Sequence, residues 1–127
     1  MANSLQPFLM DKGLSEFGDV LVNFIYSLAK SKVKNRLCGG RVSNNVLSKA
    51  ISKSGVRSYL PHRLDVHDKG NAAEALIAYA WLNGYISIND AVNLLSTHIK
   101  IDDLSSEVEA FTLLLKLILR RMGKSEV

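Results

Sequence analysis

The stretch NAAEALIAYAWLNG, residues 71–84, restricts more than any other what this chain can fold into. Its side chains are nearly all small or apolar, and Glu74 is its single charged residue. A helix that is apolar on almost every side is normally buried at the centre of a domain. A carboxylate is rarely buried there without a partner. The stretch therefore predicts a central helix that ends near Gly84, and it requires a partner for Glu74.

The remaining chain predicts further helices, because apolar residues recur at helical spacing and small polar residues stand where helices begin. Ser43 is an expected N-cap, and so is Ser87, which forms a capping-box pattern with Asp90. Either Ser105 or Ser106 is expected to cap the last helix. Besides residues 71–84, the expected helices cover residues 14–30, 43–55, 87–98 and 105–122.

Between these helices, residues 56–68 are expected to be irregular, since Leu60 precedes a proline and such residues avoid helical angles. Strand patterns are nearly absent, so the sequence predicts an all-α fold. A chain of 127 residues is large enough to bury one core. We expect one compact helical domain over residues 1–127, with its core in 14–122 and its termini at 1–13 and 123–127.

Composition excludes several classes of protein. Cys38 is the single cysteine, which excludes a disulfide framework and a cysteine-rich zinc module. The first residues lack the pattern of a signal peptide, and no apolar run approaches the length of a membrane span. We therefore expect a soluble, cytoplasmic protein without membrane contact.

Positive charge is concentrated in one part of the chain. The formal net charge is +4, and no acidic residue occurs between Asp19 and Asp65. A segregated basic segment is typical of proteins that bind nucleic-acid phosphates, although a solvated face of a mildly basic protein gives the same pattern. The residues of this segment that we expect to contact phosphate are Lys32, Lys34, Arg36 and Arg41.

Acidic residues interrupt two apolar helices. Glu16 and Asp19 share a face of one helix because they are three residues apart, and Glu74 lies on the other, one turn after Asn71. Carboxylates that share a buried site repel one another unless a cation joins them, and such oxygen ligands suit Mg²⁺ or Mn²⁺. A metal-bound water could then hydrolyse a phosphodiester. Spacing alone leaves an alternative open, in which the acids are helix N-terminal charges and a buried hydrogen bond.

Three stretches resemble segments of the ribonuclease III family. EFGDVLVNFIYSLA resembles the family's signature helix, and NAAEALIAYAWLNG resembles its second motif, usually Asp-Ala-Phe-Glu-Ala-Leu-Ile-Gly. RVSNNVL is similar to the segment that connects them, so the stretches occur in the family's order. The resemblance implies an all-α catalytic domain that forms a homodimer and cuts double-stranded RNA with Mg²⁺ or Mn²⁺, here as a short form without the duplex-RNA-binding domain of many members.

The resemblance also implies roles for individual residues. Asp19 and Glu74 match catalytic metal ligands of the family, and Glu16 and Asn71 match the remaining positions of the metal site. The basic segment would then contact RNA. Phe17 would insert into the partner subunit, although an ordinary core phenylalanine gives the same pattern.

Two positions depart from the family pattern. Glu16 stands three residues before Asp19, where the family usually has four, and Asn71 stands where the family usually has aspartate. These departures favour an alternative function, a non-catalytic RNA-binding or ribonucleoprotein assembly protein that keeps the fold. A third function, a small helical DNA-binding regulator, is favoured only by the basic segment. The first expectation is a divalent-metal-dependent endoribonuclease that processes double-stranded or structured RNA.

Overall fold

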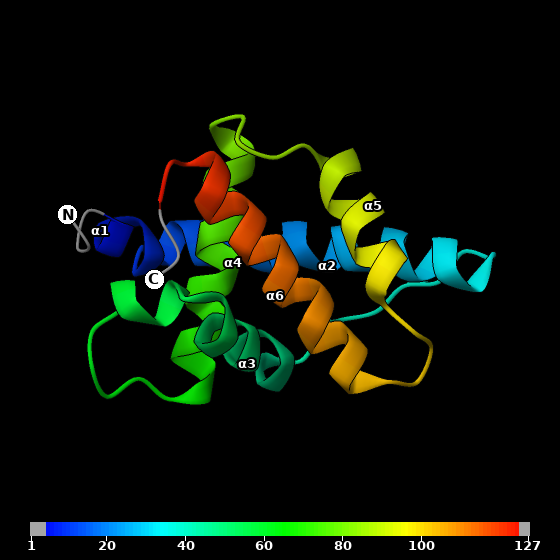
Figure 1. The fold of residues 1–127 in the computed structure, drawn as a ribbon, viewed down its shortest axis with the longest axis horizontal. Coiled ribbons are helices and arrows are strands. Elements are labelled where there is room, and N and C mark those ends of the chain that lie inside the picture. The colour runs from blue at the N-terminus through cyan, green and yellow to red at the C-terminus, as the bar shows by residue number, and fades with distance from the viewer. Residues whose placement is uncertain (1–4, 125–127) are drawn as a thin grey trace.

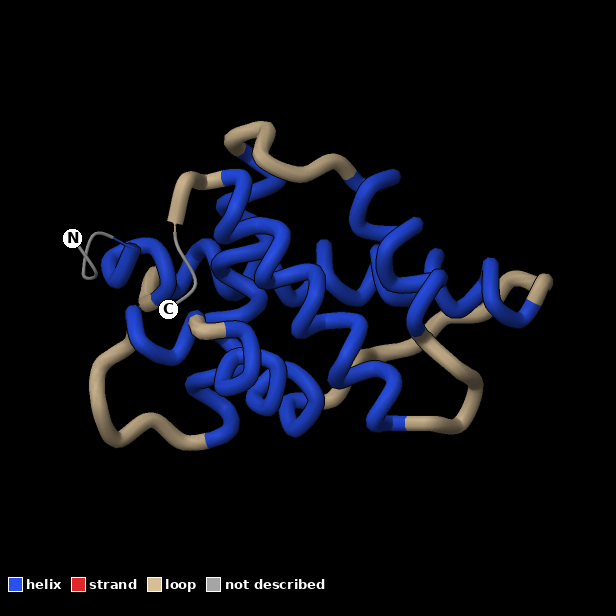
Figure 2. The backbone as a smooth tube through the Cα atoms, in the orientation of Figure 1, coloured by secondary structure: helices blue, strands red, loops and turns tan. Residues whose placement is uncertain are grey.

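The computed structural model describes residues 5–124, which form helices and no strand (Figure 2). The expected all-α fold is therefore confirmed. The elements are α1 (Gln6–Leu9), α2 (Lys12–Lys34), α3 (Asn44–Ser54), the 3-10 helix η2 (Val56–Tyr59), α4 (Val66–Leu82), α5 (Ile88–His98) and α6 (Leu104–Arg121).

The helix α4 lies at the centre of the bundle, as its apolar sequence predicts. It contacts α2, α3 and α6, and α6 crosses in front of it in Figure 1. Its side chains from Ala72 to Ala78 are buried without interruption. Alanine makes this possible because its small side chain lets neighbouring helices approach α4 closely from several sides.

Capping residues explain where α2 and α4 begin and end. Asp11 accepts a hydrogen bond from the Leu14 amide, which starts α2 two residues before the expected position. A capping box between Asp65 and Asp68 starts α4 at Val66, within the segment expected to be irregular. The helix α4 is followed by Gly84, whose φ of 78° is favourable only for glycine and a few polar residues.

The remaining helix boundaries follow the sequence closely, with one correction. Ser43 and Ser87 are the N-caps of α3 and α5, as expected. The expectation that Ser105 or Ser106 caps α6 is wrong, because Asp103 accepts a hydrogen bond from the Ser106 amide. Aspartate competes well for this position because its carboxylate also interacts favourably with the positive end of the helix dipole.

The short helix α1 adds to the core from outside the expected core range of 14–122. Leu5 and Leu9 are buried, and α1 contacts α4. Among the described residues, no helix combines the length and the apolar character that a membrane span requires. The principal consequence of the fold for function is the crossing of α2 over α4, because both helices carry the acidic residues that the sequence analysis identified.

Candidate active site

A glycine determines how closely α2 and α4 approach each other. Gly18 packs directly against the backbone of Glu74, and a β-carbon at position 18 would overlap the Glu74 carbonyl group. The crossing therefore needs glycine, and it brings the turn of α2 that carries Asp19 onto the turn of α4 that carries Glu74. This close approach explains the order Phe-Gly-Asp in the sequence of α2.

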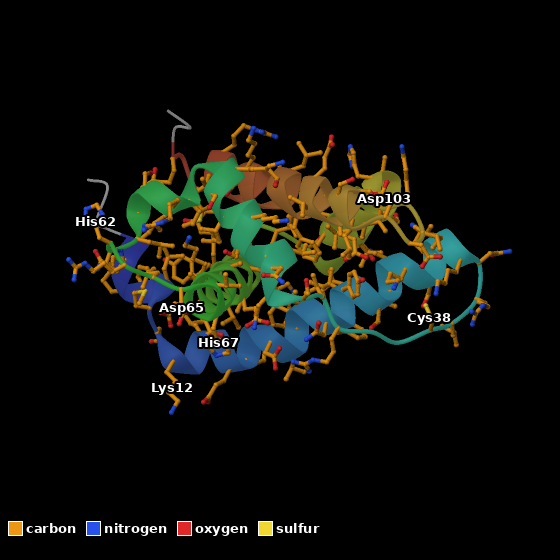
Figure 3. All side chains as sticks on the ribbon, turned by 90° about the horizontal axis from the view of Figure 1, so that it is seen from below. Lys12, Cys38, His62, Asp65, His67 and Asp103 are labelled. Atoms are coloured by element: carbon orange, nitrogen blue, oxygen red, sulfur yellow. The ribbon has the colours of Figure 1, made fainter. Side chains whose placement is uncertain are left out.

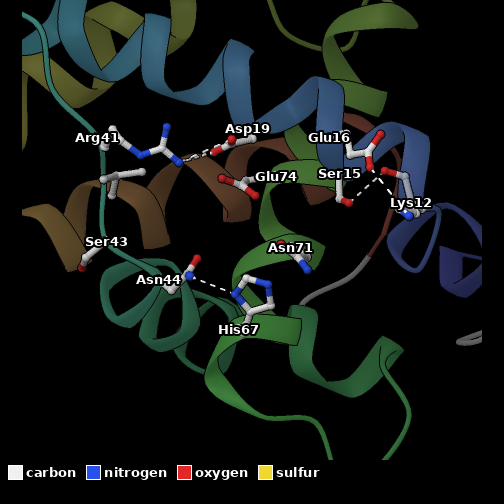
Figure 4. Close-up of a pocket in the computed structure, with 11 residues that line it drawn as sticks. Lys12, Ser15, Glu16, Asp19, Arg41, Ser43, Asn44, His67, Asn71 and Glu74 are labelled. Carbon is white, nitrogen blue, oxygen red and sulfur yellow. Dashed lines mark hydrogen bonds and ion pairs between the residues drawn. The ribbon is translucent and has the colours of Figure 1, made fainter.

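At this crossing, the carboxyl groups of Asp19 and Glu74 face each other (Figure 4). Glu74 is 6% exposed and shares a hydrogen bond with Asp19. Burial, that hydrogen bond and the negative charge of Asp19 raise the pKa of Glu74 to about 8, against a smaller opposing effect of Arg41. Near neutral pH Glu74 therefore keeps its proton, which it shares with Asp19 in this hydrogen bond, and the partner that Glu74 requires is Asp19.

Two further side chains bind Asp19 from the solvent side. Arg41 donates from Nη2 to Asp19 Oδ1 at 3.0 Å and to Oδ2 at 3.4 Å. Asn23, one turn further along α2, donates to Asp19 Oδ1 at 3.1 Å and accepts from the Val42 amide at 2.9 Å. Asn23 thereby fixes the connector between α2 and α3 at the position from which Arg41 reaches the acid pair.

The acid pair lies in an open cleft of about 570 Å³ between α2, the start of α3 and α4. On α4, Asn71 follows His67 by four positions and Glu74 follows it by seven, so all three residues lie on one face of the helix and line the cleft. The side-chain amide of Asn44 donates from Nδ2 to His67 Nδ1 at 3.2 Å. The N–H donor of the His67 ring is then Nε2. The cleft is lined by Lys12, Ser15, Glu16, Asp19, Arg41, Val42, Ser43, Asn44, His67, Asn71 and Glu74.

The four residues expected to form a metal site all line this cleft, but they do not converge on one point. Glu16 lies at the rim, where its mostly exposed carboxylate is 4.0 Å from Lys12 Nζ. Asn71 lies one turn from Glu74 on the cleft face of α4 (Figure 4). Within residues 5–124, no three His, Cys, Asp or Glu side chains lie close enough together to hold a metal ion. The close pair is Asp19 and Glu74.

The side-chain oxygens of this cleft suit a small divalent cation. Mg²⁺ keeps several of its waters and is commonly bound by one or two carboxylates together with phosphate oxygens of a substrate. A divalent cation could replace the proton of Glu74 and offset the repulsion between the two carboxylates in their charged form. The Asn71 side chain offers an uncharged oxygen in the same cleft. The residues therefore fit Mg²⁺ or Mn²⁺ bound mainly through Asp19 and Glu74.

The four basic residues expected to contact RNA are divided between two places. Arg41 lines the cleft, whereas Lys32 and Lys34 lie in the last turn of α2 and Arg36 follows that helix. Lys32 donates to Asn93 of α5 at 2.8 Å. Figure 3 shows Cys38, in the same connector, at the opposite end of the molecule from Lys12 and His67.

Phe17 lies on the outer face of α2 and is 44% exposed, so it is not an ordinary core residue. Its ring stacks on Trp81 of α4 at 6.0 Å between centroids. Val20 and Phe24, on the same side of the helix, are also exposed. The face formed by Phe17, Val20 and Phe24, here called the α2 apolar face, is thus open in a single copy of the chain.

Some residues of the cleft were not singled out by their sequence pattern. His67 could have been found, because its spacing from Asn71 and Glu74 places all three on one helix face. Lys12 and Ser15 share the face of Glu16 and Asp19 for the same reason. Asn44 enters the cleft through the packing of α3 on α4, where Gly70 leaves room for its side chain. No local sequence pattern reports that contact.

These observations define a class of structure: an all-helical domain with two facing carboxyl groups where two helices cross. A family model described as Ribonuclease III matches residues 12–124, which include every helix from α2 to α6. The chain belongs to the ribonuclease III family. It matches no curated protein in a comparison of sequences. Membership in this family indicates an RNA-cleaving function, with RNA as the substrate.

Proposed function

We propose that this protein is a divalent-metal-dependent endoribonuclease that hydrolyses double-stranded or structured RNA. The observation that carries the proposal is the pair of facing carboxyl groups of Asp19 and Glu74 in an open cleft. A buried, proton-sharing acid pair is unfavourable to keep without a function, since burial opposes the charge of both groups. Family membership supplies the substrate class, and the pair supplies the chemistry.

Asp19 and Glu74 would hold Mg²⁺ or Mn²⁺, and Asn71 would orient a water in the same cleft. The bound metal would lower the pKa of a coordinated water and so provide a hydroxide at neutral pH. Glu74 must lose its shared proton before it can act as an anionic ligand, so metal affinity should rise with pH. His67, which lines the cleft, would donate a hydrogen bond to a phosphate oxygen of the RNA.

A second copy of the chain is the occupant that we propose for the α2 apolar face. Exposed aromatic side chains grouped on one helix face are typical of interfaces, and a two-fold dimer buries the same face of both copies. Phe17, stacked on Trp81, would be the anchor of the interface. Two clefts per dimer would then be available to the two strands of an RNA duplex.

Phe17→Ala should weaken dimerisation by about 2 kcal/mol or more, as truncation of a buried aromatic anchor does. Sedimentation at micromolar concentrations measures this association. Leu37→Ala, which removes a similarly apolar side chain that is exposed on the α2–α3 connector, should leave the association unchanged. A wild-type protein that sediments as a monomer at these concentrations would contradict the dimer.

The cleavage experiment uses a duplex RNA with Mg²⁺, with Mn²⁺ and with EDTA. Wild type should cut with either metal and stop in EDTA, and Asp19→Asn should not cut. Asp102→Asn is the matched control, because it makes the same chemical change in an exposed loop outside the cleft. The nuclease proposal is wrong if the wild-type protein cuts under no divalent metal, or if Asp19→Asn cuts as fast as the control.

A non-catalytic RNA-binding or assembly role is the second candidate, and one observation favours it. The described part of the chain brings together only two carboxylates, with Asn71 where the family usually has aspartate and Glu16 paired with Lys12. If this role is correct, duplex RNA should bind equally well with EDTA and with Mg²⁺, and should remain intact. Competition with duplex DNA separates this role from that of a DNA-binding regulator.

A further inference from the structure

In this structure, the positively charged partner of Asp19 is the side chain of Arg41. Nη2 of Arg41 donates to both carboxylate oxygens of Asp19, at 3.0 and 3.4 Å, and the guanidinium lies beside Glu74 at the mouth of the cleft (Figure 4). These are the same oxygens through which a divalent cation would be bound. Because Arg41 already contacts both oxygens, it would compete with a divalent cation for Asp19.

We propose that Arg41 holds Asp19 in the absence of metal, and that a divalent cation at Asp19 and Glu74 releases Arg41 to bind a phosphate of the RNA. This inference rests on the proposed function, and it adds a coupling between metal binding and RNA binding. By linkage, RNA that binds Arg41 frees Asp19 and strengthens metal binding by the same factor.

The exposure of the two partners makes the exchange feasible. The Arg41 side chain is 74% exposed and that of Asp19 is 39% exposed, so water already reaches the ion pair. Exposed ion pairs contribute little to stability and are readily exchanged. Glu74, by contrast, is buried next to Asp19, and Arg41 directs its hydrogen bonds to Asp19, so a divalent cation would gain a second carboxylate at Glu74.

The position of Arg41 also suits its second role. The Val42 amide is held by Asn23, so the backbone beside Arg41 stays at the mouth of the cleft when the side chain leaves Asp19. The N–H groups of a guanidinium bind phosphate oxygens as well as they bind carboxylate oxygens. Arg41 can therefore exchange one anion for another by rotating its side chain alone.

The first test measures Mn²⁺ binding without RNA, by the loss of the electron paramagnetic resonance signal of free Mn²⁺. Arg41→Gln should bind Mn²⁺ about two- to fivefold more tightly than wild type, the range that an exposed ion pair of up to about 1 kcal/mol allows. Lys12→Gln removes the same charge from the same cleft but contacts Glu16 instead of Asp19, so it should have little effect. Glu74→Gln should abolish the binding.

Three results would overturn the inference. If Lys12→Gln strengthens Mn²⁺ binding as much as Arg41→Gln, the effect is that of general charge in the cleft. If Arg41→Gln binds as wild type does while Glu74→Gln does not bind, competition is absent although the metal site exists. If wild type binds no Mn²⁺, the metal site of the proposed function is wrong, and this inference fails with it.

The second test measures duplex RNA binding in EDTA, where no cleavage occurs. Asp19→Asn weakens the hold on Arg41 without metal, so it should tighten RNA binding. In the double variant with Arg41→Gln this gain should disappear, whereas in the double variant with Lys12→Gln it should persist. A gain that survives Arg41→Gln would show that the loss of the Asp19 charge, rather than the release of Arg41, strengthens RNA binding, and would overturn the second half of the inference.

Discussion

Glu74 and Glu107 are equally buried, each 6% exposed, yet their surroundings differ in the charge of the partner. Glu107, on α6, accepts a hydrogen bond of 2.7 Å from the Tyr26 hydroxyl of α2. Glu74, on α4, faces a second carboxyl group and an open cleft. One glutamate has a neutral donor that satisfies it, and the other has a neighbour that repels it once both are charged.

The comparison shows that equal burial leaves one carboxylate satisfied by a donor and places another beside a second acid. The hydrogen bond between Glu107 and Tyr26 links two helices, and burial of the tyrosine together with this bond raises the pKa of Tyr26. A buried acid beside another acid is unsatisfied in its charged form and therefore needs a cation. Access from solvent adds to the distinction, because Glu74 lines an open cleft.

The largest expected difference between the two glutamates concerns RNA cleavage. Glu74→Gln keeps the shape and the hydrogen bonding of the side chain but removes its charge, so cleavage of duplex RNA should fall by about 100-fold or more. Glu107→Gln makes the same change away from the cleft and should cut at close to the wild-type rate. If the two variants cut RNA at equal rates, the proposal that Glu74 has a role in cleavage that Glu107 lacks is wrong.

The next difference concerns stability as a function of pH in EDTA. The pKa of Glu74 rises from an ordinary 4.5 to about 8 in the folded protein, so between these values the folded state holds a proton that the unfolded state lacks. The free energy of unfolding should therefore fall as pH rises from about 4.5 to about 8. Urea unfolding at several pH values measures this decline, and Glu74→Gln should show less of it than Glu107→Gln.

A smaller effect is expected at the Tyr26–Glu107 pair. Tyr26→Phe removes the hydroxyl and leaves a buried carboxylate without its donor, so the free energy of unfolding should fall by about 1–3 kcal/mol. Glu107→Gln keeps an acceptor for the hydroxyl and should lose less. If Tyr26→Phe unfolds at the same urea concentration as wild type, the pair does not contribute to holding α2 against α6.

The smallest expected effect comes from a variant that adds a negative charge to the Glu74 cleft. Asn71→Asp should tighten Mn²⁺ binding about fivefold, because a charge about 4 Å from a cation in water-like surroundings is worth about 1 kcal/mol. Without metal, the added repulsion should lower the free energy of unfolding. Asn45→Asp adds the same charge outside the cleft and should not tighten Mn²⁺ binding. Equal Mn²⁺ affinities for the two variants would exclude Asn71 from the site.

The sequence predicted the helices well because local patterns determine them. Ser43, Ser87 and Gly84 act at the ends of helices through contacts within a few residues, and the apolar stretch around Glu74 indicates its own burial. The N-cap of α6 was predicted wrongly because Asp103, Ser105 and Ser106 are all good caps and lie next to one another. Which of them accepts the bond depends on how the preceding loop approaches the helix.

The sequence indicated that Asp19 and Glu74 would lie together, whereas Glu16 does not join them and the other contacts were not predicted. Asp19 and Glu74 stand out because charges in apolar helices are rare. That Arg41 would bind Asp19, and that Tyr26 would bind Glu107, depends on how segments far apart in the chain pack together. The basic segment suggested a single surface, whereas Lys32 and Lys34 lie in the last turn of α2 and Arg41 contacts Asp19, several turns earlier in that helix. A helix separates such positions by about 1.5 Å for every residue.

The contact of Gly18 with the backbone of Glu74 has a consequence for heat and motion. Because the two backbones touch there, the acid pair cannot widen unless α2 and α4 separate, and these helices form the centre of the bundle. The amide hydrogens around this contact should exchange with solvent only when the whole domain opens. On heating, the ability to hold a metal should therefore persist up to the unfolding transition and disappear with it.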